Sequence, residues 1–372
     1  MTAAHLRVLV TADAVGGVWQ YSIDLARGLS RLGVATVLAV TGPSPSEEQR
    51  QSASTVPGLK LVDTGLALDW LAENEAALRQ AAEGIAALAR ETEVDLVQLN
   101  APALAALADF PVPVVAVHHS CVATWWEAVH GTALPADFAW RTALVGSALR
   151  KVEAVVTPTA AFGESVRRLY GLAAAPATVH NGRTPLTLRR GAVHDFVFTA
   201  GRLWDEGKNL ATVDAAAGSV AVPVRAAGPL KGPNGAEVMF DHIHCLGALG
   251  EEEMARWLSA RPVFVSAALY EPFGLAVLEA AAAGCPLILS DIPTFRELWG
   301  EAALYVPARD EKAYVEAVSG LVSDDFERSV RGAAAAERAA RYTPDAMAAQ
   351  MASLYRRLLP AVRRPVLAAR AA

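Results

Sequence analysis

One stretch of this chain, from Glu271 to Glu279, reads Glu-Pro-Phe-Gly-Leu-Ala-Val-Leu-Glu and follows a short apolar run. The apolar run, residues 263–265, predicts a buried strand, and residues 274–283 predict a helix that ends at Gly284. A turn from strand to helix directs free backbone N–H groups and the positive end of the helix dipole at one point. The stretch therefore predicts an anion site at a strand-to-helix turn.

The spacing of the two glutamates indicates what they can do. Glu271 falls in the predicted turn and Glu279 about a turn and a half into the helix, so they should lie roughly 10 Å apart. Paired carboxylates of glycoside hydrolysis lie closer, about 5–9.5 Å apart. We therefore expect the two side chains to hold opposite ends of one long ligand, a sugar at Glu271 and a ribose at Glu279, with phosphates over the helix N-terminus.

A second group of charged residues follows another predicted strand, 196–199. Arg202 and Lys208 stand six residues apart on a loop that begins with Gly201. Such a pair can hold a diphosphate from two sides, since arginine offers a planar fork and lysine a point charge. An exposed turn with surface salt bridges is the alternative interpretation of these charges alone. The sequence contains no Asp-x-Asp, so we expect no metal or other cofactor, and a leaving diphosphate would be neutralised by protein charge and dipoles.

The first half of the chain begins with a predicted central strand, 6–10, that is followed by the glycine pair Gly16 and Gly17. This places a glycine-containing turn at the carboxyl end of a parallel strand, where open α/β sheets bind ligands. A glycine pair in a first turn can equally serve tight packing.

A histidine occupies the corresponding position after another predicted strand, 112–117. His118 directly follows this strand, so its imidazole can face a ligand and donate to a sugar hydroxyl or to a developing charge. His119 shares this role or points away. A packed, hydrogen-bonded histidine is an equally good interpretation of either residue.

Taken together, these motifs resemble those of the GT-B retaining glycosyltransferases of family 4. Residues 270–279 are similar to the Glu-x7-Glu signature of that family, and residues 201–209 are similar to its Gly-Arg-x-x-x-x-Lys-Gly motif, with Asn209 in place of the second glycine. The resemblance implies catalytic roles for His118, Arg202, Lys208 and Glu271. It implies a donor-binding site formed by Gly16, Gly17, Arg202, Lys208, Leu246, Glu271, Pro272, Phe273, Gly274, Leu275 and Glu279.

The resemblance also implies the architecture. We expect a GT-B fold with two doubly wound, Rossmann-like α/β domains that face a cleft. Residues 1–185 would form the acceptor-side domain and residues 195–343 the domain that binds the nucleotide sugar. Residues 344–372 would form a C-terminal helix that crosses back to the first domain, and a tail.

The implied reaction moves a hexose from a nucleoside-diphosphate sugar to an acceptor hydroxyl with retention, in polysaccharide or glycoconjugate synthesis. The acceptor would be a sugar, a lipid-linked hydroxyl or another hydroxyl compound. Two alternatives stay open: a GT-B phosphorylase or synthase that acts on a sugar phosphate, and a sugar-nucleotide-binding protein without turnover.

Composition excludes several other classes. The chain has 372 residues, 53% of them hydrophobic, and a net charge of −6, which disfavours nucleic acid as a partner. Its three isolated cysteines predict neither a disulfide framework nor a zinc site. We expect a cytoplasmic protein, since no apolar stretch is long enough to cross a bilayer. The last residues carry arginines without acids, which permits weak contact with the inner face of a membrane.

Three further expectations concern local structure. The polar stretch 43–54 predicts a mobile loop, and residues 68–89 predict one long amphipathic helix. A group of aromatic and histidine residues is expected to border the acceptor side of the cleft: Trp125, Trp126, His130 and Trp140.

Overall fold

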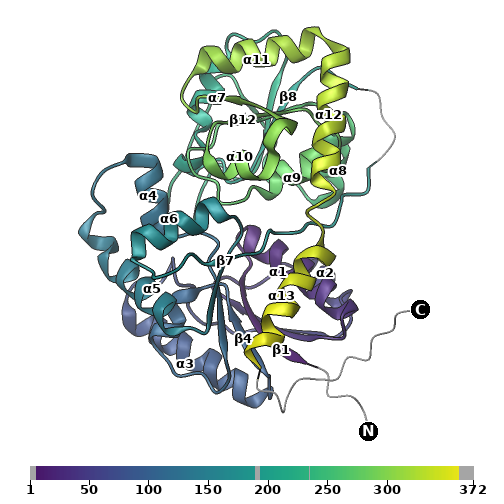
Figure 1. Cartoon of the computed structure of the whole chain (residues 1–372). Helices are drawn as coiled ribbons and strands as arrows, with labels where there is room; N and C mark the ends of the chain where they lie inside the picture. The colour runs from purple at the N-terminus through teal and green to yellow at the C-terminus, as the bar shows by residue number, and fades with distance from the viewer. Residues whose placement is uncertain (1–5, 189–192, 234, 360–372) are drawn as a thin grey trace. The chain divides into compact units, whose positions relative to one another are not determined.

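The structure is a computed structural model that describes residues 6–188, 193–233 and 235–359 (Figure 1). The chain divides into two compact units. Unit 1 consists of Met1–Thr124, Leu134–Gly182 and Thr343–Ala372, and unit 2 consists of Trp125–Ala133 and Arg183–Tyr342. Each unit has its own parallel sheet with its own hydrophobic core.

The sheet of unit 1 has seven parallel strands in the order β3-β2-β1-β4-β5-β6-β7. They are β1 (Arg7–Asp13), β2 (Ala35–Thr41), β3 (Leu59–Asp63), β4 (Leu96–Leu99), β5 (Val114–Val117), β6 (Ala154–Thr157) and β7 (Ala177–Thr178). The order reverses at β1, which pairs with β2 on one side and with β4 on the other. In open parallel sheets, the carboxyl ends of the strands at such a reversal are the usual place for a ligand.

Helices cover both faces of this sheet. They are α1 (Gly17–Arg31), α2 (Glu47–Ser54), α3 (Glu75–Glu91), α5 (Ala139–Lys151), α6 (Ala160–Tyr170) and α13 (Pro344–Leu358), while α4 (Val122–His130) begins in unit 1 and ends in unit 2. Val8 and Val10 of β1 pack in one core with α1 and α13, whereas Leu9 packs in a second core with α3 and α5. Alternate residues of the strand thus face opposite layers, which explains why Val8, Leu9 and Val10 are apolar without alternation.

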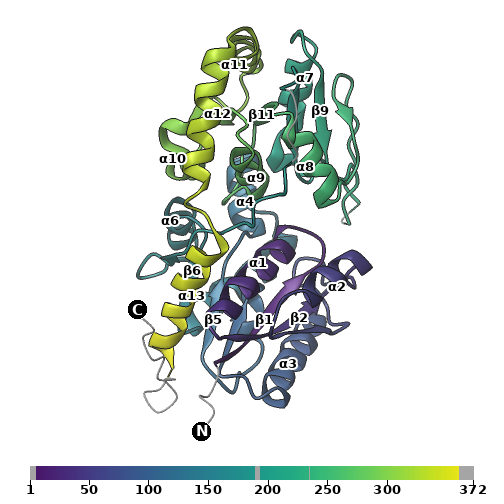
Figure 2. The ribbon, with the colours of Figure 1, turned by 90° about the vertical axis from the view of Figure 1, so that its right-hand side faces the viewer.

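The last helix, α13, belongs to unit 1 and lies along α1 (Figure 2). The two helices approach closely at Gly28, where a Cβ atom would lie 2.6 Å from the Cβ atom of Ala348. On α13, Met351 and Tyr355 are fully buried, and the Tyr355 hydroxyl donates a hydrogen bond to Gln98. The prediction that the final helix returns to the first sheet is confirmed.

The sheet of unit 2 has six parallel strands in the order β10-β9-β8-β11-β12-β13. They are β8 (Val197–Ala200), β9 (Val224–Ala227), β10 (His244–Cys245), β11 (Val263–Ser266), β12 (Leu287–Ser290) and β13 (Ala303–Val306). The order reverses at β8, which pairs with β9 and with β11. The turns that leave β8 and β11 are therefore neighbours at the carboxyl edge of the sheet.

The helices of unit 2 are α7 (Leu210–Ala217), α8 (Glu251–Ser259), α9 (Leu275–Ala282), α10 (Pro293–Trp299), α11 (Glu311–Ser323) and α12 (Asp325–Ala339). Phe198 of β8 packs in a core with α8, α9, α10 and α12, while its neighbour Val197 packs in a core with α7 and α11. Unit 2 is therefore doubly wound, like unit 1, and the predicted fold class is confirmed.

Two local predictions are wrong. The stretch 43–54 contains a helix, α2, because Ser46 and Gln49 form a capping box: the Ser46 hydroxyl accepts from the Gln49 N–H at 3.2 Å, and the Gln49 side chain accepts from the Ser46 N–H at 2.9 Å. The helix predicted over 68–89 begins only at Glu75. Asn74 caps it by accepting a hydrogen bond from the Ala77 N–H at 3.0 Å.

Two expectations concern membranes. Within the described part of the chain, none of the helices combines the length and the apolar character that crossing a bilayer requires. Most of the arginine-containing tail lies outside the described residues.

Gly228 lies where two neighbouring turns of unit 2 approach closely, and its replacement should lower the stability of the protein. Gly228 has φ +143°, and a Cβ atom there would lie 1.8 Å from the Gly201 carbonyl oxygen. Replacement of Gly228 by alanine should lower the free energy of unfolding by at least about 2 kcal/mol, since both the backbone and the close approach forbid a side chain.

Calorimetry of thermal unfolding measures this effect, and Gly320→Ala is the matched control. Gly320 lies in α11, and a Cβ atom added there would have no described neighbour within 4 Å. Its replacement should therefore leave stability unchanged or raise it by up to about 1 kcal/mol. Equal melting temperatures for both variants would contradict the prediction.

Candidate functional site

The turn that follows β8 is organised by the carboxylate of Asp205, which is buried. Its Oδ1 atom accepts hydrogen bonds from the Gly207 N–H and from the Trp125 indole, both at 2.9 Å. Its Oδ2 atom accepts from Arg202 at 2.8 Å. Asp205 thus folds the turn back on itself and holds the Arg202 guanidinium beside it, while the Arg202 side chain stays 42% exposed.

The second cation of this turn, Lys208, forms an ion pair with Glu271. The two side chains come from the turns after β8 and β11, and each is less than a fifth exposed. The structure therefore brings together two residues of the predicted site that are 63 positions apart in the chain. The partner of Lys208 belongs to the signature stretch, unlike the local salt bridge of an ordinary exposed turn.

Backbone and amide hydrogen bonds fix these two turns against each other. The Gly207 carbonyl accepts from the N–H groups of Leu269 at 2.9 Å and of Tyr270 at 3.2 Å. Asn209, which has φ +53°, donates through its side chain to the Ala267 carbonyl at 3.0 Å and to the Ala308 carbonyl at 2.7 Å. The relative position of Lys208 and Glu271 therefore depends on bonded backbone rather than on the ion pair alone.

Helix α9 begins beside this pair, directly after Gly274. Gly274 has φ +89°, and a Cβ atom there would lie 3.2 Å from the Glu271 Cγ atom and 3.3 Å from the Phe295 ring. Gly274 has no side chain to cap the helix, and the N–H groups of the first turn have no acceptor within the helix. An uncapped N-terminus next to a cation favours an anionic group above it.

The other predicted residues of the signature stretch differ in exposure. The Phe273 side chain is buried in the core against the Tyr342 ring, at a centroid distance of 5.7 Å, so only its backbone can take part in a site. Pro272 is also buried, whereas Leu275 is partly exposed. Leu246 lies after β10, is partly exposed, and donates its N–H to the Ala226 carbonyl at 2.8 Å.

The second signature glutamate, Glu279, contacts a residue for which the sequence indicated no role. The Arg183 Nε atom donates to the Glu279 Oε1 atom at 2.6 Å, and an Arg183 Nη atom donates to Glu251 at 2.8 Å. The Arg183 side chain is 5% exposed. The spacing of residues in the sequence gives no signal of these contacts, because the two carboxylates lie 96 and 68 positions away from Arg183.

In unit 1, Gly16 and Gly17 lie at the carboxyl end of β1 and at the start of α1. The Asp13 carboxylate accepts hydrogen bonds from the N–H groups of Val15 at 2.9 Å and Gly16 at 3.2 Å, which shapes the turn. A Cβ atom at Gly16 would meet nothing within 4 Å. Tight packing within the described structure therefore does not account for Gly16.

His118 lies directly after β5 and is buried. Its ring stacks on Phe162 and meets the edge of Tyr170, at centroid distances of 5.7 and 6.2 Å. Neither ring nitrogen has a hydrogen-bond partner within the described part of the chain. The His118 ring is thus packed among aromatic rings, as one of the two interpretations of the sequence expects.

The neighbouring His119 has a different environment. Its Nε2 atom lies 3.1 Å from the Asn100 Oδ1 atom, and its ring meets the edge of Tyr21 at 4.4 Å. Burial, assisted by the nearby His118, lowers the pKa of His119 to about 3, so this ring is neutral at physiological pH. His119 can therefore donate or accept a hydrogen bond but carries no charge.

The aromatic group that was expected to border the acceptor side of the cleft is divided between the two units. Trp125, Trp126 and His130 belong to unit 2, and Trp125 supports the Asp205 turn rather than an acceptor site in the first domain. Trp140 lies in unit 1, where it packs against the core that α3 and α5 form.

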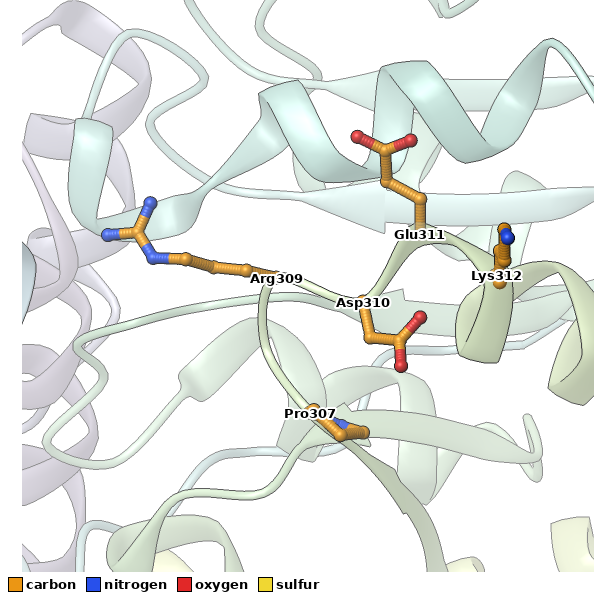
Figure 3. A pocket seen from close by; sticks show the side chains of 5 residues that line it. All are labelled: Pro307, Arg309, Asp310, Glu311 and Lys312. Atoms are coloured by element: carbon orange, nitrogen blue, oxygen red, sulfur yellow. The ribbon is translucent and has the colours of Figure 1, made fainter.

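Two surface cavities of unit 2 do not contain the predicted charged residues. One, of about 410 Å³, lies at the turn between β13 and α11 and is lined by Pro307, Arg309, Asp310, Glu311 and Lys312 (Figure 3). The other, of about 670 Å³, reaches the Asp205 turn from the side of α7. Among the described residues, no group of three or more His, Cys, Asp or Glu could hold a metal ion.

The arrangement in unit 2 can bind a ligand that has an anionic centre and hydroxyl groups. Lys208 and the N-terminus of α9 supply positive potential, and the partly exposed Arg202 adds a second cation to the same turn. Glu271 and Glu279 supply hydroxyl acceptors at either end of the stretch. Sequence reasoning missed Asp205, although an Asp two residues before a glycine is a recognised signal for a side chain that folds a turn.

Two family models match the chain, and together they span most of it. The model described as Glycosyltransferase Family 4 matches residues 15–184, and the model described as Glycosyl transferases group 1 matches residues 194–324. The first contains β2 to β7 of unit 1, and the second contains all six strands of the sheet of unit 2.

Curated relatives match a shorter stretch. The phosphatidyl-myo-inositol mannosyltransferase of Mycobacterium leprae is 32% identical over 120 residues, which is 32% of this chain and 32% of that protein. The matched part of the chain thus spans about a third of the length of this relative.

Solved structures match nearly the whole chain at lower identity. Sucrose-phosphate synthase from Thermosynechococcus elongatus superimposes with a TM-score of 0.78 at 19% identity, covering 95% of this chain and 99% of that one. The Anabaena protein HepE, in complex with UDP and glucose, gives a TM-score of 0.68 at 15% identity, covering 94% and 99%. These similarities establish the GT-B fold.

The environment of His118 predicts an unusually acidic thiol. The Cys121 Sγ atom lies 3.2 Å from the Thr124 hydroxyl and accepts from the Tyr170 hydroxyl at 3.2 Å. Burial raises the pKa of Cys121, but the electrostatic interaction with the neighbouring His118 and these hydrogen bonds outweigh it and lower the pKa to about 7. The rate of alkylation of Cys121 should therefore rise through a midpoint near pH 7.

Mass spectrometry of iodoacetamide-treated protein across pH 5 to 10 measures this midpoint. His118→Asn removes the interaction with the imidazole and should move the midpoint to higher pH. Cys245 is the internal control, because burial and the Asp214 carboxylate raise its pKa. A midpoint above pH 8.5, or one that His118→Asn leaves in place, would contradict the prediction.

Proposed function

Because the chain belongs to the GT-B glycosyltransferases of family 4, we propose that it transfers a hexose from a nucleoside-diphosphate sugar to an acceptor hydroxyl. The observation that carries the proposal is the Lys208–Glu271 ion pair beside the uncapped N-terminus of α9. A cation and a helix dipole suit a diphosphate, and a carboxylate in contact with that cation suits the hydroxyl groups of the attached sugar. One sugar nucleotide satisfies all three features.

The donor would bind to unit 2 in an extended arrangement. Its diphosphate would lie over the N-terminus of α9, between Lys208 and Arg202. Its sugar hydroxyls would bind Glu271 and its ribose hydroxyls Glu279. The nucleoside would lie along the turn after β10, which contains Leu246.

In the reaction, the bond between the anomeric carbon and the diphosphate oxygen breaks as negative charge grows on the leaving oxygen. Lys208, Arg202 and the α9 dipole stabilise that charge from fixed positions, which lowers the barrier without solvent rearrangement. The acceptor hydroxyl forms the new glycosidic bond, and its proton passes to the leaving diphosphate. Retention at the anomeric carbon, with His118 near the donor sugar, is proposed from the family resemblance alone.

The acceptor would bind to unit 1, near the turn that contains Gly16 and Gly17. The Mycobacterium leprae relative, about a third of which this chain matches, is named for phosphatidyl-myo-inositol. For this chain we propose the broader class, a sugar or lipid-linked hydroxyl compound, in polysaccharide or glycoconjugate synthesis.

The donor site is tested by binding. A thermal-shift screen of UDP-, GDP- and ADP-sugars should identify one donor that raises the melting temperature, since a ligand at 100 times its Kd adds about 2.7 kcal/mol of stability. Calorimetry with that donor should show a Kd about 10 to 100 times higher for Lys208→Ala and for Glu279→Ala, because each change removes a charged hydrogen-bonding group.

Lys312→Ala is the matched control, since this lysine is exposed in the first turn of α11. It should bind the donor like the unaltered protein. The proposed site is refuted if no sugar nucleotide binds, or if Lys208→Ala and Glu279→Ala both bind with unchanged affinity.

Protein charge alone should neutralise the leaving diphosphate. The chain contains no Asp-x-Asp, so the transfer rate measured with the selected donor should be the same in 5 mM EDTA as in 5 mM MgCl₂. Release of the nucleoside diphosphate provides the assay. A rate that falls at least about tenfold in EDTA, and returns with added Mg²⁺, would overturn metal independence.

A further inference from the structure

Arg183 occupies a special position in unit 2. It is the first residue of Arg183–Tyr342, the longer of the two segments that form unit 2, and its N–H donates to the carbonyl of Tyr342, the last residue of that segment, at 3.1 Å. Its side chain extends from this point to two carboxylates, Glu279 at 2.6 Å and Glu251 at 2.8 Å. Arg183 thus joins the path of the main chain to the second signature glutamate.

The two carboxylates differ in exposure and in the elements that carry them. Glu279 lies on α9 and is 16% exposed, whereas Glu251 is the first residue of α8 and is 63% exposed. Helix α8 follows directly on the turn after β10 that contains Leu246. The guanidinium therefore ties the beginning of α8 to the middle of α9, the two elements that flank the proposed nucleoside position.

Because Arg183 is charged and buried, it requires the contact with these carboxylates. A guanidinium remains protonated at any physiological pH, and removal of its buried partner leaves an uncompensated charge. Its planar fork also offers donors in fixed directions, so it determines the orientation of the carboxylate that it contacts. A carboxylate has about four lone-pair positions, so contact with Arg183 through Oε1 is compatible with hydroxyl donors on the same group.

We propose that Arg183 is a positioning residue for the donor: it orients the Glu279 carboxylate towards the ribose hydroxyls and holds the α8 turn beside the nucleoside. This inference rests on the proposed function, because it requires a ribonucleotide at Glu279. It adds a residue that resemblance to the family did not assign. A purely structural ion pair would have the same distances but would not affect which nucleotide binds.

A positioning role and a purely structural role of Arg183 differ in their effect on how strongly the protein prefers ribose to 2′-deoxyribose. Calorimetry would compare UDP, GDP and ADP with their 2′-deoxy counterparts. The unaltered protein should bind its preferred ribonucleotide at least about tenfold more tightly than the 2′-deoxy form, since loss of the hydroxyl leaves a charged acceptor unsatisfied. Arg183→Met should reduce this ratio to about twofold or less.

Arg328→Met is the matched control. Arg328 has a 4% exposed side chain and an ion pair of 2.6 Å with the exposed Asp195, so it has the same kind of environment on α12. Its replacement should lower the melting temperature and leave the ratio unchanged. If Arg183→Met does not fold, Arg183→Lys carries the test, because one ammonium group lacks the fork that reaches both carboxylates, and its ratio should fall at least about threefold.

The outcomes distinguish the two proposals. If the unaltered protein binds none of the three ribonucleotides, the proposed function fails. If it binds one of them and discriminates against the 2′-deoxy form, but the folded Arg183 variants keep the full ratio, Arg183 is a structural residue only and the inference is overturned. If Arg328→Met also lowered the preference for the ribonucleotide over its 2′-deoxy form, the inference would be overturned as well, since the effect would then reflect a general loss of stability.

Discussion

The ion pair between Lys208 and Glu271 lies at the centre of the candidate site, and the hydrogen bonds of Gly207 and Asn209 hold its two turns in place. It joins the turns of two neighbouring strands at the point where the strand order of unit 2 reverses. Without a ligand, partly buried charges require counter-charges from the protein itself, and Arg202 and Arg183 are likewise held by Asp205 and Glu279. Each of these three cations is therefore held in its orientation by a carboxylate of the protein itself.

The fold class could be predicted from the sequence because buried parallel strands have no polar face. Residues 8–10 and 263–265 are apolar without alternation, and they lie in the central strands β1 and β11. The predictions failed where side-chain hydrogen bonds determine the structure. Ser46 and Gln49 begin a helix that low hydrophobicity concealed, and Asn74 sets the start of a helix whose apolar pattern extends further back. Capping depends on single residues, so a periodic pattern gives no warning of it.

The candidate site could be predicted only to the level of its motifs. Arg202, Lys208 and Glu271 were recognisable because their loops follow strands, and the structure brings Lys208 and Glu271 into contact. Asp205 and Arg183 were not recognised as parts of the site, because their roles depend on distant partners. The two carboxylates that contact Arg183, those of Glu251 and Glu279, lie 68 and 96 positions away in the chain. Spacing in the sequence contains no information about such pairs.

Gly274 and Gly16 differ in whether the fold itself requires a glycine. Gly274 is explained within the fold, because its φ of +89° and the atoms around it disfavour a Cβ. Gly16 has an extended backbone, with φ −151°, and open space where its side chain would be. Neither strain nor packing in the described structure requires glycine there. Gly16 lies at the carboxyl end of β1, where the strand order of unit 1 reverses, and this is the usual place for a ligand in open parallel sheets. A glycine at this position leaves the backbone open to close approach.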